Sequence, residues 1–220
     1  MNNLKPLKFL NIDMNKIHYP IKASEGSKMN VFKKLKTLKV QKFIIFHPSA
    51  QYQYKIYPSH LRNILLTGLS KLGIPILITG SNNSIDLEIK NNLPKLPNII
   101  DFIGETTLEE FISLCELSIG YIGMDTLNMH IAASLNKPIF AIFGPTNLKM
   151  WSPWSNELEL SASEDKPLQT YGNITIFQAA LPCVACANAG CDDNQGRSEC
   201  LHIIDPNIIL YQVNKWYINA

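Results

Sequence analysis

The sequence predicts an α/β fold in which a parallel sheet carries helices on both faces. From residue 43 onward, apolar runs of strand length alternate with segments of helical periodicity, and only short connections separate them. Such alternation favours right-handed crossovers between parallel strands. With 46% hydrophobic and 17% charged residues, the 220-residue chain can bury one sizeable core.

Five apolar runs are expected to form the strands of this sheet. Each run is short, rich in isoleucine, phenylalanine or other strand-forming residues, and bounded by glycine, proline or a polar turn residue. In chain order the runs are 43–46, 75–80, 98–104, 116–123 and 137–146. Because all are apolar along their length, we expect both faces of the sheet to be covered.

The connecting helices are predicted from apolar residues that repeat with the helical period. They are 59–73, 84–93, 106–118 and 126–136, and a further amphipathic helix at 205–220 closes the chain. The helix at 106–118 has the strongest start signal. Its capping box is formed either by Thr106 with Glu109 or by Thr107 with Glu110.

Composition and charge exclude several classes of protein. No apolar run approaches the roughly 20 residues that span a bilayer, and the N-terminus lacks the continuous apolar stretch of a secretory signal. The formal net charge of +2 is too small to indicate a nucleic-acid-binding protein. We therefore expect a cytoplasmic protein without a nucleic-acid partner.

Two regions of the chain are expected to differ in organisation. Residues 1–42 predict a linker or remnant segment, whereas residues 43–220 predict one Rossmann-like domain. The first region is lysine-rich, since residues 27–42 carry six lysines interleaved with apolar side chains. A basic amphipathic helix on an anionic membrane surface is one interpretation of this pattern, and a solvated helix or linker is the other.

Ligands of open parallel sheets bind beyond the carboxyl ends of the strands. Four stretches lie there: 47–55, 79–84, 123–130 and 143–151. In the third, a helix starting near Thr126 points unpaired N–H groups and its positive dipole end at a ligand, which suits a phosphate. Asp125 could accept hydrogen bonds from sugar hydroxyls, the Thr126 hydroxyl could donate to phosphate, and His130 lies one turn further. The alternative is that Asp125 caps the helix and His130 packs.

Three motifs follow one another along the chain: GETTLEE from Gly104, DTLNMHIAA from Asp125 and PIFAIFGPT from Pro138. They resemble the C-terminal half of glycosyltransferase family 9, the heptosyltransferase family. HPSAQYQYKIYP is similar to the family's H-P-G-A and K-x-W-P signatures, with Lys55 matching the lysine and Tyr57 standing where tryptophan is usual. The resemblance extends over residues 43–217.

The resemblance implies the nucleotide-sugar-binding domain of a GT-B glycosyltransferase, an enzyme with two facing Rossmann-like domains. The donor-binding residues that we carry over or consider are Lys55, Ser81, Asp86, Asp125, Thr126, Leu127, Asn128 and His130. By resemblance Lys55 neutralises the donor phosphate and Asp125 contacts the sugar. Thr126 and the backbone amides after it hold the diphosphate, and His130 supports that turn.

Three positions depart from the family pattern. Leu127 replaces a glycine, and a leucine adds bulk where a glycine lets the backbone approach a pyrophosphate. Ser49 replaces the glycine of H-P-G-A. The glutamate that usually follows the second-loop glycine is missing, which leaves polar residues of that loop, among them Ser81 and Asp86, to contact the ribose.

The resemblance also implies an activity, namely inverting transfer of heptose from ADP-heptose without a metal. The acceptor is lipid-linked or an oligosaccharide of lipopolysaccharide or surface-glycan synthesis, which places the enzyme in the cytoplasm, peripherally at the inner membrane. The catalytic base belongs to an N-terminal domain that residues 1–42 cannot build. No catalytic residue is therefore assigned, and a second chain could supply the acceptor domain. The alternative is a non-catalytic nucleotide-sugar-binding module or a truncated family member.

Four cysteines gather in the loop at 183–200: Cys183, Cys186, Cys191 and Cys200. Their spacing fits a tetrahedral zinc site. The family has a similar loop without a metal in its chemistry, so free thiols or a disulfide are favoured over structural zinc. We expect no resident cofactor, since the nucleotide sugar is a substrate.

Overall fold

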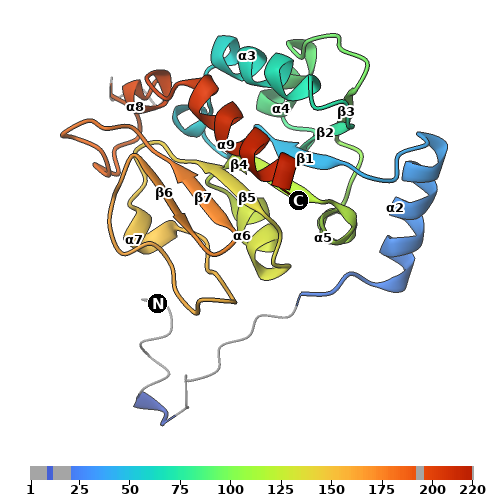
Figure 1. The fold of residues 1–220 in the computed structure, drawn as a ribbon, viewed down its shortest axis with the longest axis horizontal. Coiled ribbons are helices and arrows are strands. Elements are labelled where there is room, and N and C mark those ends of the chain that lie inside the picture. Colours follow the sequence, from blue (N-terminus) through green and yellow to red (C-terminus); the bar gives the residue numbers. More distant parts are fainter. Residues whose placement is uncertain (1–8, 12–20, 192–195, 220) are drawn as a thin grey trace.

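The computed structural model describes residues 9–11, 21–191 and 196–219 (Figure 1). Its centre is a seven-stranded sheet with the order β3-β2-β1-β4-β5-β7-β6. The strands are β1 Ile44–His47, β2 Ile76–Gly80, β3 Ile99–Ile103, β4 Gly120–Met124, β5 Ile139–Ile142, β6 Leu168–Tyr171 and β7 Ile174–Phe177. All neighbours are parallel except β6 and β7. The predicted α/β class with a mostly parallel sheet is confirmed.

The strand order reverses direction at β1, and this reversal positions the site. From β1 the chain first adds β2 and β3 on one side, and then returns to add β4 and β5 on the other. In the parallel pairing of β1 with β4, His47 lies opposite Gly123. The connections after these two strands leave in opposite directions, which opens a crevice at their carboxyl ends.

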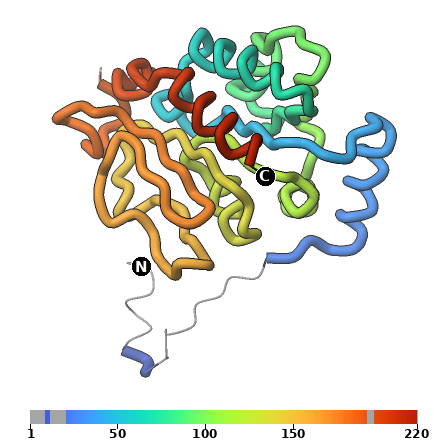
Figure 2. The backbone as a smooth tube through the Cα atoms, viewed as in Figure 1, coloured from blue at the N-terminus to red at the C-terminus, as the bar shows by residue number. Residues whose placement is uncertain are grey.

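Helices cover both faces of the sheet. Their bounds are α2 Glu25–Thr37, η2 Gln53–Lys55, α3 Ser59–Ser70, α4 Ser84–Asn91, α5 Leu108–Leu117, α6 Leu127–Ser134, α7 Leu148–Trp151, α8 Glu199–His202 and α9 Pro206–Asn219. The core cluster on one face contains residues of α3, α4 and α9, and the cluster on the other face contains residues of α2, α5 and α6. Figure 2 shows the last helix running back over the sheet toward the chain that enters β1.

The structure adds a hairpin that the sequence analysis does not predict. β6 and β7 pair antiparallel, and β7 joins the parallel sheet beside β5. Gly172 turns the chain between them with a φ of 51°, a conformation that glycine adopts without steric cost. The signal was present in the sequence, because Gly172-Asn173 separates two short β-rich runs.

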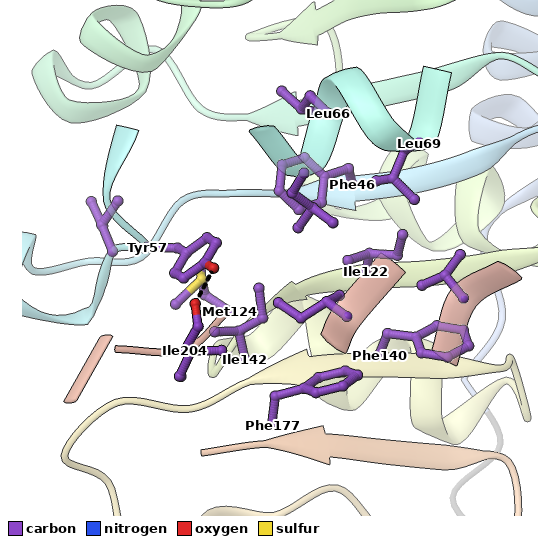
Figure 3. Close-up of a cluster of buried hydrophobic side chains, with 14 of the residues drawn as sticks. Phe46, Tyr57, Leu66, Leu69, Ile122, Met124, Phe140, Ile142, Phe177 and Ile204 are labelled. Carbon is purple, nitrogen blue, oxygen red and sulfur yellow. Dashed lines mark hydrogen bonds between the residues drawn. The ribbon is translucent and has the colours of Figure 1, made fainter. Parts of the chain in front are cut away.

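A buried tyrosine ties the start of α3 to the C-terminal part of the chain. Figure 3 shows Tyr57 inside a cluster of apolar side chains, with its hydroxyl pointing toward Ile204. The hydroxyl donates a 2.5 Å hydrogen bond to the Ile204 carbonyl. Burial raises the pKa of this phenol well above its usual range. Tyr57 therefore fixes the position of η2, which ends two residues before it at Lys55.

The lysine-rich segment forms a helix that packs on the domain. α2 buries Val31 and Leu35 in the core cluster that it shares with α5. Lys34 donates to the Glu105 carbonyl and lies 3.2 Å from the Glu110 carboxylate. Docking on α5 thus uses part of the apolar side of α2. The membrane-surface interpretation stays a prediction; no helix in the described part of the chain is both long and apolar enough to cross a bilayer.

The capping box of α5 uses the second of the two predicted registers. Thr107 Oγ1 accepts from the Glu110 amide at 3.2 Å, and the Glu110 carboxylate accepts from the Thr107 amide at 3.0 Å. We expect Thr107→Ala to lower the free energy of unfolding by about 1 kcal/mol, because it removes the N-cap acceptor. Thr106→Ala is the matched control, and urea unfolding should place it within about 0.5 kcal/mol of wild type. Equal losses in both variants would contradict this assignment.

Candidate functional site

A cavity of about 440 Å³ lies at the carboxyl ends of β1, β2 and β4. The first turns of α5 and α6 and the segment around η2 complete its wall. Seven of the eight predicted donor-binding residues line it: Lys55, Ser81, Asp86, Asp125, Thr126, Leu127 and Asn128. The structure therefore brings together residues from three separate loops of the chain.

Lys55 and Asp125 form an ion pair across this cavity. The Lys55 ammonium donates to Asp125 Oδ2 at 3.1 Å. Asp125 is almost fully buried, whereas a quarter of the Lys55 side chain is exposed to solvent. An ammonium carries three N–H donors. Lys55 can therefore hold a ligand oxygen while it remains paired with Asp125.

The N-terminus of α6 faces the cavity without a side-chain cap. Thr126, not Asp125, is the N-cap residue, and its side chain makes no capping hydrogen bond. Its Oγ1 is buried without a hydrogen-bond partner among the described residues. The amides at Leu127 and Asn128 begin the helix, so they and the helix dipole give this wall of the cavity a positive potential.

Asp86 organises the loop after β2. Its Oδ2 accepts from the Ser81 amide at 2.9 Å and from the Ser81 hydroxyl at 2.7 Å. Asn83 Oδ1 accepts from the Asp86 amide at 2.8 Å and caps α4. Asp86 Oδ1 has no hydrogen-bond partner in the described part of the chain. This oxygen lies close to Gly80, where a Cβ would come within 2.6 Å of it. The Asp86 carboxylate is thus fixed in the wall of the cavity.

His47 is a cavity residue that the list of donor-binding residues lacks. Its Nδ1 lies 2.9 Å from Thr79 Oγ1, and its ring packs edge-on against Phe111 with 6.1 Å between centroids. Burial lowers the pKa of this imidazole to about 4, and the charge of Asp86 opposes that shift. The ring is therefore neutral at physiological pH. The signal in the sequence was the His-Pro that follows the first strand.

The buried neutral His47 makes stability depend on pH. The pKa is about 4 in the folded chain and near 6.5 when exposed, so below pH 6.5 protons bind the unfolded chain first. Stability is then lost as the pH falls from about 6.5 to 4, by roughly 2 kcal/mol at pH 5. We expect urea unfolding of wild type to show this loss between pH 7.5 and 5, and His47→Gln to show a loss about 2 kcal/mol smaller. If the unfolding free energies of wild type and His47→Gln fell equally with pH, this prediction would be wrong.

His130 lies outside the cavity of about 440 Å³. It lines a separate cavity of about 270 Å³ with Trp154 and residues of α6, and burial lowers the pKa of its imidazole. Leu127 lines both cavities, and its side chain is 58% exposed. The leucine that replaces the family glycine therefore stands between the two cavities, at the start of α6.

The cysteines of the loop at 183–200 are free in the structure. Cys183, Cys186 and Cys191 are exposed, and Cys200 is buried. Burial raises the pKa of the Cys200 thiol to about 11. No group of three or more His, Cys, Asp or Glu within the described ranges is arranged to hold a metal ion. The expectation of a chain without a resident cofactor stays a prediction.

The comparison with protein families gives one clear match. The model described as glycosyltransferase family 9 (heptosyltransferase) matches residues 5–179. Lipopolysaccharide heptosyltransferase 3 of Escherichia coli is 26% identical over 121 residues, which are 54% of this chain and 36% of that protein. Lipooligosaccharide heptosyltransferase 2 of Haemophilus influenzae is 28% identical over 141 residues, 61% of this chain and 41% of that protein. The matches thus span well under half of these relatives.

Solved structures share the fold. Escherichia coli ADP-heptose lps heptosyltransferase II gives a TM-score of 0.69 at 20% identity, covering 96% of this chain and 56% of that one. The family 9 glycosyl transferase of Veillonella parvula gives 0.73 at 14% identity, with 99% and 59% covered. Escherichia coli heptosyltransferase WaaC with ADP gives 0.60 at 13% identity, with 92% and 52% covered. The likeness establishes the architecture of this chain.

Proposed function

Because the chain belongs to glycosyltransferase family 9, we propose that the cavity at the β1–β4 crevice binds the diphosphate of ADP-heptose for glycosyl transfer. The observation that carries the proposal is that Lys55 lies 3.1 Å from Asp125, the residue directly before Thr126, the N-cap of the uncapped helix α6. A cation and a helix N-terminus on one cavity wall form an anion site. One of the solved relatives is described as a complex with ADP.

The same groups would stabilise the leaving group of the transfer. When the bond from the sugar to the diphosphate breaks, negative charge grows on the departing phosphate oxygen. The Lys55 ammonium and the amides of Leu127 and Asn128 are fixed before reaction, so they stabilise that charge without reorganising. This chain thus contributes donor binding and leaving-group stabilisation without requiring a metal.

Two carboxylates are suited to the hydroxyl groups of the donor. Asp86 lines the cavity together with Ser81, and we assign this pair to the ribose. Asp125 Oδ2 accepts from Lys55, and a carboxylate has further lone pairs on both oxygens, so we assign Asp125 to the transferred sugar. Ser81 acts through Asp86, since its hydroxyl already donates to that carboxylate.

The acceptor side of the reaction is proposed from the family. A lipid-linked or oligosaccharide acceptor of lipopolysaccharide synthesis would approach the cavity, with inversion at the anomeric carbon and the base supplied by an acceptor domain on a second chain or segment. The glycosyl transfer would take place at the cytoplasmic face of the inner membrane. The rival proposal, a non-catalytic nucleotide-sugar-binding module, is favoured by one observation: the exposed Leu127 side chain lines the cavity where the family has glycine.

Calorimetric titration tests donor binding. ADP, UDP and GDP, and the corresponding nucleotide sugars, are titrated into wild type and Asp125→Ala. We expect ADP-heptose to bind below millimolar concentration, and Asp125→Ala to weaken the nucleotide sugar more than ADP. The absence of binding by every nucleotide at millimolar concentration would refute both proposals.

Turnover separates the enzyme from the binding module. ADP release from ADP-heptose is followed with a lipid A core acceptor. We expect little or no turnover by the chain alone. Turnover that appears when a family 9 acceptor domain is added would support the enzyme, whereas donor binding without turnover under both conditions would support the module.

A further inference from the structure

A second cavity, of about 220 Å³, shares the η2 segment with the cavity proposed to bind the nucleotide sugar, which we call the nucleotide-side cavity. Its wall combines the start of α3, one side of α4, and the segment leading into α8. Figure 1 shows α8 beside α3. Gln53 and Ile56 line this cavity, whereas Lys55 between them lines the other one. The two cavities are therefore neighbours with separate linings.

Cationic and hydrogen-bond-donating groups from different elements line this second cavity. α3 is a twelve-residue helix whose N-cap is Pro58, which offers no side-chain cap to the first amides. His60 of α3 and His202 of α8 face one another with 6.0 Å between ring centroids, and both line the cavity. Arg197 also lines it, although its guanidinium pairs with Glu199 at 2.8 Å.

The observation that points to a ligand is Arg62. It is 2% exposed, lines the cavity, and its Nε has no hydrogen-bond partner among the described residues. Burial lowers the pKa of this guanidinium, but an arginine stays protonated at neutral pH. Ser198, 3% exposed and also in the lining, has an equally unpartnered Oγ. The charge of Glu88, at the exposed side of α4, favours the protonated guanidinium, but the buried Nε donor of Arg62 stays without a hydrogen-bond acceptor among the described residues. A buried donor without an acceptor is costly, so a bound anion that accepts from it would stabilise the site.

We propose that this cavity is an anion site for a phosphate group, either free orthophosphate or the phosphoryl group of a phosphorylated saccharide. The donors are the first amides of α3, the Arg62 side chain of the same helix, and the segment that leads into α8. This spread of directions suits a tetrahedral anion better than a planar carboxylate. The helix dipole of α3 adds to the attraction. Glu88 is the one carboxylate in the described lining, and it lies on the exposed side of α4.

The test follows the imidazole signals of His60 and His202 by NMR while orthophosphate or glucose 1-phosphate is added to the full chain. We expect both signals to shift saturably at millimolar concentration in wild type and equally in Lys55→Met, whose nucleotide-side cavity is impaired. Arg62→Met, which replaces a buried charge by an apolar chain of similar length, should weaken binding at least tenfold. Ser198→Ala, a smaller change, should weaken it several-fold. ADP affinity should be unchanged in both variants.

The results of this titration either identify the ligand of the proposed phosphate site or overturn the proposal. Tighter binding of orthophosphate identifies the free anion as the ligand, and tighter binding of glucose 1-phosphate identifies a phosphorylated saccharide. Histidine signals that do not move, or Arg62→Met and Ser198→Ala chains that bind phosphate like wild type, would overturn the proposal. Loss of the shifts in Lys55→Met would place the phosphate in the nucleotide-side cavity and overturn it as well.

Discussion

Replacing Lys55 by methionine should weaken ADP binding about 100-fold. A hydrogen bond to a charged group contributes about 1.5–3 kcal/mol, and each 1.4 kcal/mol corresponds to about tenfold in affinity. The variant also leaves the buried Asp125 carboxylate without its cation, so Asp125 would repel the diphosphate. Calorimetric titration of ADP into wild type and Lys55→Met measures the difference.

A double variant separates a direct contact from an indirect one. Lys55→Met with Asp125→Asn removes both charges of the pair and the repulsion by Asp125, so it should bind ADP more tightly than Lys55→Met but still well below wild type. If the double variant recovered wild-type affinity, Lys55 would act only by neutralising Asp125, and the proposed phosphate contact would be wrong. Lys36→Met, at an exposed position of α2, is the matched control and should leave ADP affinity unchanged.

Replacing Gly123 by valine should cost about 3 kcal/mol of unfolding free energy. A Cβ at this position would lie 2.7 Å from the His47 carbonyl oxygen and 2.6 Å from the Tyr121 hydroxyl oxygen. The first neighbour is backbone of the paired strand β1, which cannot move aside cheaply, and overpacking of a close-packed interior typically costs about 1–3 kcal/mol. Urea unfolding measures the loss of unfolding free energy. ADP titration should show weaker binding, because residues at the displaced ends of β1 and β4 form the wall of the cavity.

Gly26→Ala provides the contrast to this prediction. Gly26 lies in α2, and a Cβ there would meet no atom within 4 Å. Alanine is favoured over glycine in a helix by about 0.5–1 kcal/mol, so this variant should be slightly more stable than wild type. A Gly123→Val chain with the stability of wild type would show that β1 and β4 are packed less closely than the structure indicates.

Local sequence patterns were sufficient for most of the sheet. The five predicted strands are present. The apolar character of β1, β2, β4 and β5 agrees with their burial between two helical layers, whereas the edge strand β3 is buried only at Phe102 and Ile103. The predicted ends of the strands and helices differ more from the structure than the predicted number and type of these elements. The run expected as a strand from residue 116 begins at Gly120, because α5 continues to Leu117. Helix and strand overlap there in composition, and the capping at Thr107 does not determine where the helix ends.

The site was predictable only in part. Asp125 could be named from its place after a predicted strand end, and Lys55 and Asp86 from the resemblance to the family. The structure brings these three residues to one cavity. His130 was assigned by its position in a motif, but the geometry turns it to a different cavity. The placement of side chains around a helix depends on packing with other elements, which spacing alone does not contain. For the same reason the unpaired Oγ1 of Thr126 could not be foreseen.

The ion pair across the crevice joins residues 70 positions apart in the chain. Loop closure over that distance must precede the contact, because β4 has to reach β1 after the two intervening crossover units have formed. We therefore expect the nucleotide-side cavity to be assembled late in folding, which φ-value analysis at Lys55 and Asp125 would test. A ligand held there would act chiefly on the rate of unfolding, lengthening the lifetime of the native chain and leaving the speed of its formation almost unchanged.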